Sequence, residues 1–226
     1  MAFSFLGRGG GTGSRGEGDG AKFVQLAEVR AYWEGLRGLA GLPRRDQIDP
    51  RGIAGALDTV FLLERVAPGV ARFRLAGMQI NELLGMDVRG MPLSALIDPA
   101  SRARIAEAVD ALFAGPAILT LGLEAERALG RPALEGRLIL LPLLSARGPC
   151  DLALGCLATH GAIGRAPRRF AVAHLQSEPL AAAPAADRRY HAPELVSAGM
   201  AEAAAVYTTA QPQVPRGKPV LRLVKG

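Results

Sequence analysis

The chain has 226 residues, the size of one main domain with additional tails and too short for two full domains. Hydrophobic residues make up 49% of it, enough to form a buried core, which excludes a chain that is disordered throughout. The formal net charge of +6 comes almost wholly from arginine, in a sequence also rich in alanine and glycine. This balance is typical of a coding bias, and we do not take it as a sign of a polyanionic partner.

Both ends of the chain have the composition of flexible segments. Residues 7–20 contain eight glycines, and residues 181–218 are rich in alanine and proline. Such sequences cannot bury enough apolar surface to offset chain entropy. We predict a disordered arm over residues 1–21, a folded domain over 22–180 and a disordered tail over 181–226. Within this tail, residues 219–225 form a short apolar stretch that could add as a strand to the edge of a sheet.

Helical periodicity marks two segments of the domain. Over residues 22–38, apolar side chains recur at helical spacing until Gly38, which predicts an N-terminal amphipathic helix. Further on, Asp98-Pro99 supplies an N-cap and a proline at the first helical position. An apolar stripe then runs from Ile105 to Phe113 before Gly115-Pro116, which predicts a second helix.

A hairpin is predicted between these helices. Thr59–Val66 is a strand candidate, and Pro68-Gly69 supplies the residues of a type II turn. In the second strand, Ala71–Ala76, apolar and basic residues alternate. We expect Phe73 and Leu75 to face the core, with the intervening arginines in water.

Three further strands are predicted over residues 119–123, 134–143 and 152–159. The strands are therefore grouped as a hairpin followed by a run of three, and they do not alternate with helices. This order favours the α+β class with an antiparallel sheet of five strands and flanking helices.

Residue types that carry chemistry are few and scattered. His160, His174 and His191 lack the spacing of a structural zinc site, and we expect no metal. Cys150 and Cys156 would lie ~20 Å apart along one strand, too far for a disulfide, and we expect reduced core thiols. A further hypothesis is that the protein is an enzyme that uses Cys156 or His160. Retained turnover in a variant with both residues changed to alanine would exclude it.

Nucleic-acid and membrane signals are weak. Gly11–Gly16 matches the letters of a dinucleotide fingerprint, but no strand precedes it in the glycine-rich arm. Arg168-Arg169-Phe170 is the nearest approach to a basic patch with an aromatic residue, and it is more typical of a solvated helix or tail. The apolar runs are too short to cross a membrane, and the first residues lack a signal peptide. We expect a cytoplasmic protein without a nucleic-acid partner.

Over residues 28–160 the sequence resembles a family of small, mostly single-domain bacterial PAS proteins. The matching stretches are Tyr32-Trp33 with Leu36-Arg37-Gly38, Leu42-Pro43 with Arg45, Ile48-Asp49-Pro50, Phe61-Leu62-Leu63, Phe73 to Gly77, Glu82 to Asp87, Gly90, Leu140-Leu141-Pro142-Leu143, Asp151 and Leu154-Gly155. The resemblance implies a five-stranded antiparallel sheet, one face of which short helices cover to form a small pocket for ligand sensing or protein contact.

The resemblance also implies which residues could form sites. The residues expected to line the pocket, with ordinary core packing as the alternative for each, are Phe73, Leu75, Met78, Leu83, Leu84, Met86, Leu96, Ile105, Leu121, Leu140 and Leu154. The N-terminal helix often mediates dimerisation or passes on a signal in such domains, and its residues for dimer or partner contact are Phe23, Leu26, Trp33 and Leu36.

No cofactor is identified. The cysteine motif Asn-Cys-Arg-Phe of flavin photosensors does not occur, and residues 98–113 carry no histidine where haem-binding relatives have one. Flavin and haem are therefore not expected, and catalysis is not implied by the resemblance.

Two functions of different classes follow. The first is a non-catalytic sensory or regulatory PAS module that binds a small apolar ligand, forms a homodimer and passes its output to another signalling protein. The second is a constitutive adaptor that binds no small molecule and docks a partner through its C-terminal tail. Deletion of residues 219–226 should abolish partner capture in the adaptor and leave ligand binding by the sensor unchanged.

Overall fold

The structure, a computed structural model, describes residues 22–37, 41–146 and 148–180. The expected arm, the expected tail and the apolar stretch 219–225 lie outside the described residues. In chain order the elements are α2 (Val24–Arg37), η1 (Arg45–Gln47), η2 (Pro50–Ala56), β1 (Val60–Ala67), β2 (Val70–Ala76), α3 (Met78–Leu84), η3 (Leu93–Leu96), η4 (Pro99–Ser101), α4 (Arg102–Ala114), β3 (Ala117–Ala125), β4 (Glu135–Leu144), β5 (Cys150–His160) and β6 (Phe170–Pro179).

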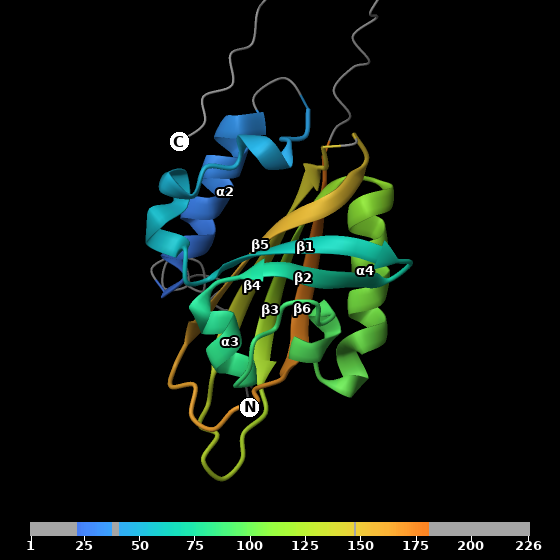
Figure 1. Cartoon of the computed structure of the whole chain (residues 1–226). Helices are drawn as coiled ribbons and strands as arrows, with labels where there is room; N and C mark the ends of the chain where they lie inside the picture. The colour runs from blue at the N-terminus through green and yellow to red at the C-terminus, as the bar shows by residue number, and fades with distance from the viewer. Residues whose placement is uncertain (1–21, 38–40, 147, 181–226) are drawn as a thin grey trace, which may run out of the picture. The chain divides into compact units, whose positions relative to one another are not determined.

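The strands form one antiparallel sheet in the order β2-β1-β5-β4-β3-β6. The sheet is strongly twisted, and the β1–β2 hairpin crosses the direction of the other strands (Figure 1). Gly69 of the Pro68-Gly69 turn has a φ of 67°, a left-handed conformation that glycine adopts without strain. The predicted α+β class, antiparallel sheet and hairpin are confirmed.

A sixth strand, β6, was not predicted. It pairs with β3 along its whole length and makes the edge of the sheet opposite β2. Its burial alternates only at Phe170 and Val172, before a bulge opposite Gly122 and Leu123, and most of the remaining residues are exposed. So short an alternation gives little strand signal in the sequence.

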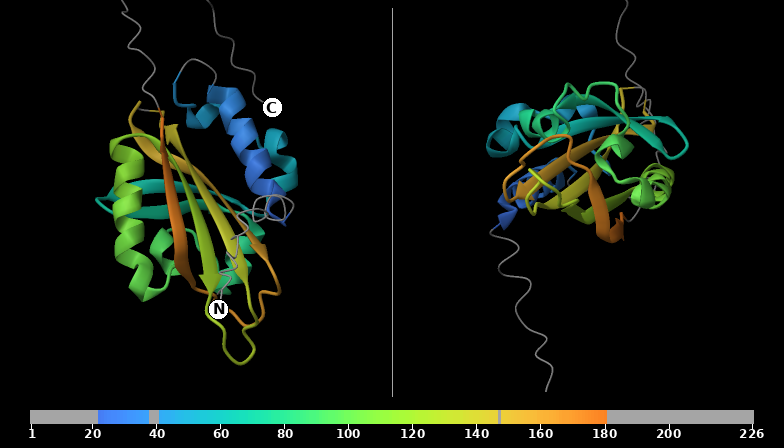
Figure 2. Two further views of the ribbon diagram at one scale, coloured as in Figure 1. Left: turned by 180° about the vertical axis from the view of Figure 1, so that it is seen from behind. Right: turned by 90° about the horizontal axis from the view of Figure 1, so that it is seen from below.

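Helices cover the sheet from both sides, α2 on one face and α4 on the other (Figure 2). On the second side, residues from all six strands pack with α3, η3 and α4 in one cluster, the α3/α4-face core. Its larger members are Phe61, Leu63, Phe73, Ile80, Leu83, Leu84, Leu93, Leu96, Ile97, Ile105, Leu112, Phe113, Leu119, Leu121, Leu123, Leu138, Leu140, Leu157 and Phe170. The Phe61 and Phe73 rings meet edge to face at 5.2 Å, and Phe61 lies over Gly155, where a Cβ would overlap the ring.

The other side holds a smaller cluster, the α2-face core. It consists of Val29, Trp33, Ile53, Ala56, Leu62, Ile118, Ile139, Leu141, Leu143, Leu152, Leu154 and Cys156. Trp33 is fully buried in it, and its indole Nε1 donates a hydrogen bond of 3.1 Å to the Pro142 carbonyl of β4. A buried indole with its N–H satisfied fixes α2 against the sheet.

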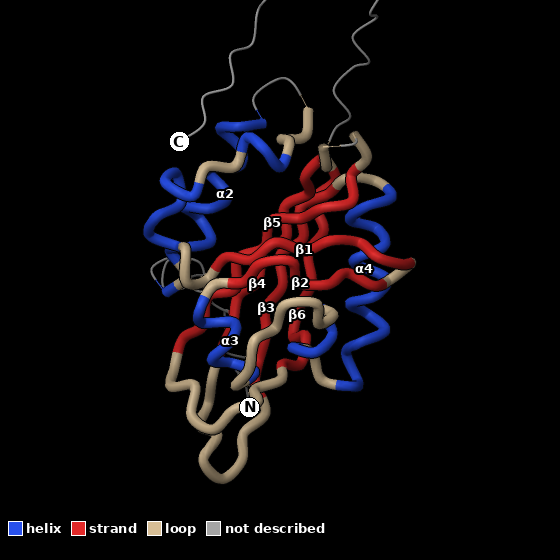
Figure 3. Tube along the Cα trace, in the orientation of Figure 1, coloured by secondary structure: helices blue, strands red, loops and turns tan. Residues whose placement is uncertain are grey.

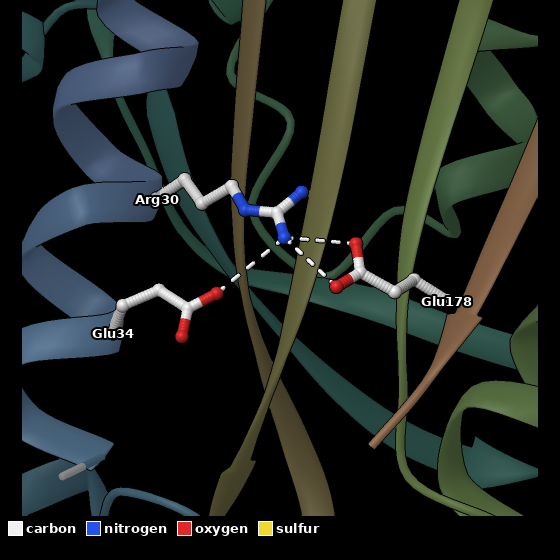
Figure 4. Close-up of polar contacts among 3 residues, drawn as sticks. All are labelled: Arg30, Glu34 and Glu178. Atoms are coloured by element: carbon white, nitrogen blue, oxygen red, sulfur yellow. Dashed lines mark hydrogen bonds and ion pairs between the residues drawn. The ribbon is translucent and has the colours of Figure 1, made fainter.

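A polar contact also joins α2 to the last strand. The Arg30 guanidinium lies 2.8 Å from the Glu178 carboxylate of β6 and 3.5 Å from that of Glu34, one helical turn along α2 (Figure 4). All three side chains are partly exposed, so the contribution to stability is small. The contact nevertheless sets α2 against the edge strand that leads toward the C-terminus.

A β-bulge changes the face of Leu75. Leu62 pairs with Leu75, but the next residue, Leu63, pairs with Phe73, so Arg74 is an extra residue in β2. Because one inserted residue reverses the alternation of side chains, Leu75 lies on the opposite face from Phe73. The expectation that both face one core is therefore wrong: Phe73 is buried, whereas Leu75 is 48% exposed.

Arg168 corrects a second expectation. Its side chain is not solvated but fully buried, and it donates hydrogen bonds to the backbone carbonyls of Ile163, Glu126 and Pro132. These carbonyls belong to the β3–β4 and β5–β6 loops at the end of the sheet near α3 (Figure 3). One guanidinium group therefore forms hydrogen bonds with two loops at the start of β6.

Candidate functional site

The structure divides the residues expected to line a pocket. Seven of them are buried in the α3/α4-face core: Phe73, Leu83, Leu84, Leu96, Ile105, Leu121 and Leu140. Leu75, Met78 and Met86 are exposed, and Leu154 belongs to the α2-face core. The eleven residues therefore do not form one site. The bulge turns Leu75 outward, Met78 is exposed at the start of α3 and Met86 in the turn after it, and strand alternation places Leu154 on the other face.

Ile105 also lines a cavity. This cavity of 180 Å³ lies between the β1–β2 hairpin, η3 and α4. Its lining residues are Gly69, Val70, Ala71, Pro92, Leu93, Ser94, Arg102, Ile105, Ala106 and Val109. Part of the expected set therefore does reach a small cavity on the α3/α4 side.

A second cavity lies on the α2 side, where η1 and η2 approach the β1–β2 hairpin. We call it the β1–β2 cavity; its volume is 210 Å³ and its walls are largely apolar. Its lining residues are Arg45, Ile48, Pro50, Ile53, Leu57, Val60, Phe61, Leu62, Leu75, Ala76, Gly77, Leu143 and Leu154. Two residues from the sequence-based set, Leu75 and Leu154, thus line a cavity on a face that was not expected to hold one.

Local backbone features shape this cavity. The bulge at Arg74 brings Leu75 to its wall, as the register shows. Gly77 then passes against the chain at Leu57 and Asp58, where a Cβ would overlap their carbonyl oxygens, and its N–H donates to the Val60 carbonyl at 2.8 Å. Glycine is therefore required for η2 to lie this close to the end of β2.

Arginines border the β1–β2 cavity. An adjoining cavity of 430 Å³ is lined by Arg45, Leu62, Arg74, Leu75 and Arg89. Arg45 and the two leucines therefore line both spaces, with apolar walls on one side and guanidinium groups on the other. Local sequence patterns do not predict this arrangement, since the three arginines are far apart in the chain.

A polar cavity of 420 Å³ shares Arg45 and Arg74 with the adjoining space. It is also lined by Asp46, Glu64, Ser145, Ala146, Asp151 and Leu152. The Ser145 hydroxyl and one Asp151 carboxylate oxygen are buried here without a hydrogen-bond partner among the described residues. Buried polar atoms of this kind are usually satisfied by water or by a ligand.

The residues expected for partner contact on α2 point mostly inward. Trp33 and Phe23 are buried in their own chain, and Leu26 and Leu36 are half-buried. The helix exposes its opposite side, which includes Val24. Phe23 and Trp33 are therefore not available to a partner in this arrangement, because the amphipathic stripe packs on the sheet.

The thiols show no activation. Burial raises the pKa of Cys156 to about 11, and its sulfur lies 3.3 Å from the Thr59 hydroxyl. Burial and the neighbouring Asp151 raise the pKa of Cys150 to about 11. Since the thiolate is the nucleophile, both cysteines lack the depressed pKa of a catalytic one.

The described residues contain neither a metal-binding cluster nor a membrane-spanning helix. The ranges 22–37, 41–146 and 148–180 hold no group of three His, Cys, Asp or Glu side chains arranged to bind a metal ion. No helix in the same part of the chain is long and apolar enough to span a membrane.

Comparison with known proteins agrees with the fold. No curated protein matches the chain. A family model described as PAS domain matches residues 22–158, which is more than half of the chain and includes α2, the first four strands and most of β5. β6 follows this match and extends the sheet beyond it. The chain therefore belongs to the PAS domain family, whose members are sensory and regulatory modules.

Proposed function

We propose that this chain is a non-catalytic sensory or regulatory PAS module, which binds a small apolar ligand in the β1–β2 cavity and signals through protein contacts. One observation carries the proposal. Ile53, Leu62, Leu143 and Leu154 line the cavity and also belong to the α2-face core, together with Trp33 of α2. A ligand that changes how these walls pack would therefore change the support of α2.

Packing provides the route from ligand to output. Glu28 of α2 accepts a hydrogen bond of 3.2 Å from the Gly55 N–H of η2, and the Tyr32 hydroxyl accepts one of 2.7 Å from the Asp49 N–H that precedes η2. η2 therefore connects the cavity wall to the helix. A ligand shifts the position of α2 only if it binds one arrangement more tightly than another, and a signalling protein or a second copy of the chain would detect that difference.

Native mass spectrometry of the purified full-length chain, with an absorbance spectrum of the same sample, tests ligand binding. We expect a co-purifying mass or, for an empty protein, binding of small apolar compounds that changes the emission of Trp33, the single tryptophan of the sequence. Light scattering of both forms then tests the expected homodimer.

Two matched variants locate the ligand. Val60→Phe places a larger side chain in the β1–β2 cavity, because Val60 lines this cavity and packs against the α2-face core, and Ala106→Leu does so in the cavity beside α4. We expect only Val60→Phe to abolish binding. Loss of binding in Ala106→Leu alone would transfer the site to the α3/α4 side, and the absence of any bound compound would contradict a sensory role for either cavity.

A further inference from the structure

The opening of the β1–β2 cavity has an unusual lining. Of the five residues around the adjoining 430 Å³ space, three are arginines, Arg45, Arg74 and Arg89, and the other two are Leu62 and Leu75. Two of these arginines come from elements outside the sheet, Arg45 from η1 and Arg89 from the turn after α3, and Arg74 is the bulged residue of β2.

The charges around this opening are not balanced within the described residues. Glu64 is shared by Arg72 and Arg74, at 3.0 Å and 3.4 Å. Asp46, the nearest carboxylate in sequence to Arg45, lies 3.4 Å from Arg44 instead. In the part of the chain that the structure describes, the Arg45 and Arg89 side chains have no ion-pair partner, and Arg45 is half-buried. Like charges gathered beside apolar walls raise the local positive potential.

These observations specify the chemistry of an occupant. A guanidinium group beside leucines binds a carboxylate or phosphate through charge-assisted hydrogen bonds, and the leucines and the cavity beyond them favour an apolar tail. The carboxylates of Glu64 and Asp151 line the polar 420 Å³ cavity and would repel an anion there. The acidic head is thereby restricted to the space between Arg45, Arg74 and Arg89.

We propose that the ligand of the β1–β2 cavity is a small amphipathic anion, whose apolar tail lies among Ile53, Leu62 and Leu154 and whose acidic head binds Arg45, Arg74 and Arg89. This inference rests on the proposed function, because it assigns a chemical class to the ligand of the same cavity. It also gives the bulge at Arg74 a role, since the bulge places a leucine and an arginine side by side at the opening.

The test compares probes with one tail and different heads. Octanoate, octan-1-ol and octylammonium are titrated into the full-length chain by calorimetry, with the emission of Trp33 as a second readout. We expect octanoate to bind about tenfold or more tightly than octan-1-ol, the gain that charge-assisted hydrogen bonds provide, and octylammonium to bind most weakly.

Arginine variants show whether the head is bound where we place it. Arg45→Gln and Arg89→Gln should each weaken octanoate about tenfold and leave octan-1-ol unchanged, by loss of the same kind of hydrogen bond. Arg127→Gln is the matched control, because Arg127 is exposed in the β3–β4 loop and the net charge changes equally. Octanoate affinity should not change in this control.

The outcomes separate the two proposals. If octan-1-ol binds as tightly as octanoate and Val60→Phe abolishes the binding of both, the cavity is a ligand site but the proposed anionic head is wrong. If no probe binds, the inference and the proposed ligand site both fail. Sedimentation with phosphatidylglycerol vesicles provides one more arm: vesicle binding that needs Arg45 and that octanoate does not displace would replace the soluble ligand with a membrane surface.

Discussion

The two faces of the sheet differ in how completely they are covered. On one side, residues of all six strands pack with α3, η3 and α4 in a single large core made of apolar side chains. On the other, α2 and η2 cover β1, β4 and β5, and the end of β2 is left beside a cavity with arginines at its opening. The face with the larger apolar core is thus more completely packed, and the cavity that we propose as the ligand site lies where the cover is incomplete.

We expect the greatest loss of stability when the packing of α2 on the sheet is disturbed. Trp33→Ala removes a fully buried indole and its hydrogen bond to Pro142, and should lower the free energy of unfolding by about 3–5 kcal/mol. Urea unfolding followed by circular dichroism measures this loss. Val24→Ala on the exposed side of α2 is the control and should change stability by less than about 0.5 kcal/mol. Equal effects of the two variants would mean that α2 does not pack on the sheet.

Alanine substitution at one glycine on each face compares how tightly the two faces are packed. A methyl group at Gly155 would overlap the buried Phe61 ring in the α3/α4-face core, so Gly155→Ala should cost about 1–3 kcal/mol. At Gly122, on the α2 face, it would meet the exposed His174 ring and the end of the half-buried Arg137 side chain, both of which can move, so Gly122→Ala should cost less than about 1 kcal/mol. The same unfolding assay ranks them, and the reverse order would contradict the difference in packing.

Each face of the sheet packs against one cysteine, whose titration should affect stability at high pH. Cys156 belongs to the α2-face core and Cys150 packs against the other, and burial raises the pKa of each from 9.0 to about 11. The folded state therefore holds these protons more tightly than the unfolded state. Their contribution to stability is complete below pH 9 and is lost as pH rises through about 11. The urea midpoint should fall over this range less steeply in Cys150→Ala and in Cys156→Ala than in the parent, and equal slopes would contradict the raised pKa values.

The smallest effect is expected at the contact between α2 and β6. Arg30 and Glu178 are partly exposed, so a double-mutant cycle with Arg30→Gln and Glu178→Gln should give a coupling energy of about 0.2–1 kcal/mol. The coupling should decrease in high salt because ions screen exposed charges. A coupling well above this range would show that the contact is a main determinant of the position of α2.

Local sequence patterns predicted most of the fold but little of the candidate site. The two main helices, the hairpin turn and five strands were recognisable because each has a periodicity or a turn residue of its own. β6 was not, because its alternation ends after Val172. Leu75 was assigned to the wrong face because a bulge appears only when two strands are paired. Two of the three carbonyl partners of Arg168, those of Glu126 and Pro132, are more than thirty residues away in the chain.

The α+β class, the antiparallel sheet, an amphipathic N-terminal helix and the resemblance to PAS domains could all be derived from sequence patterns alone. These depend on side-chain periods and motifs that are local in the chain. Tertiary contacts, in contrast, place Trp33 on the sheet of its own chain, bring Leu75 and Leu154 to one cavity, and set Arg45, Arg74 and Arg89 around its opening. Such features depend on strand register and on which distant segments meet, and the free energy that selects them comes from packing across the whole domain.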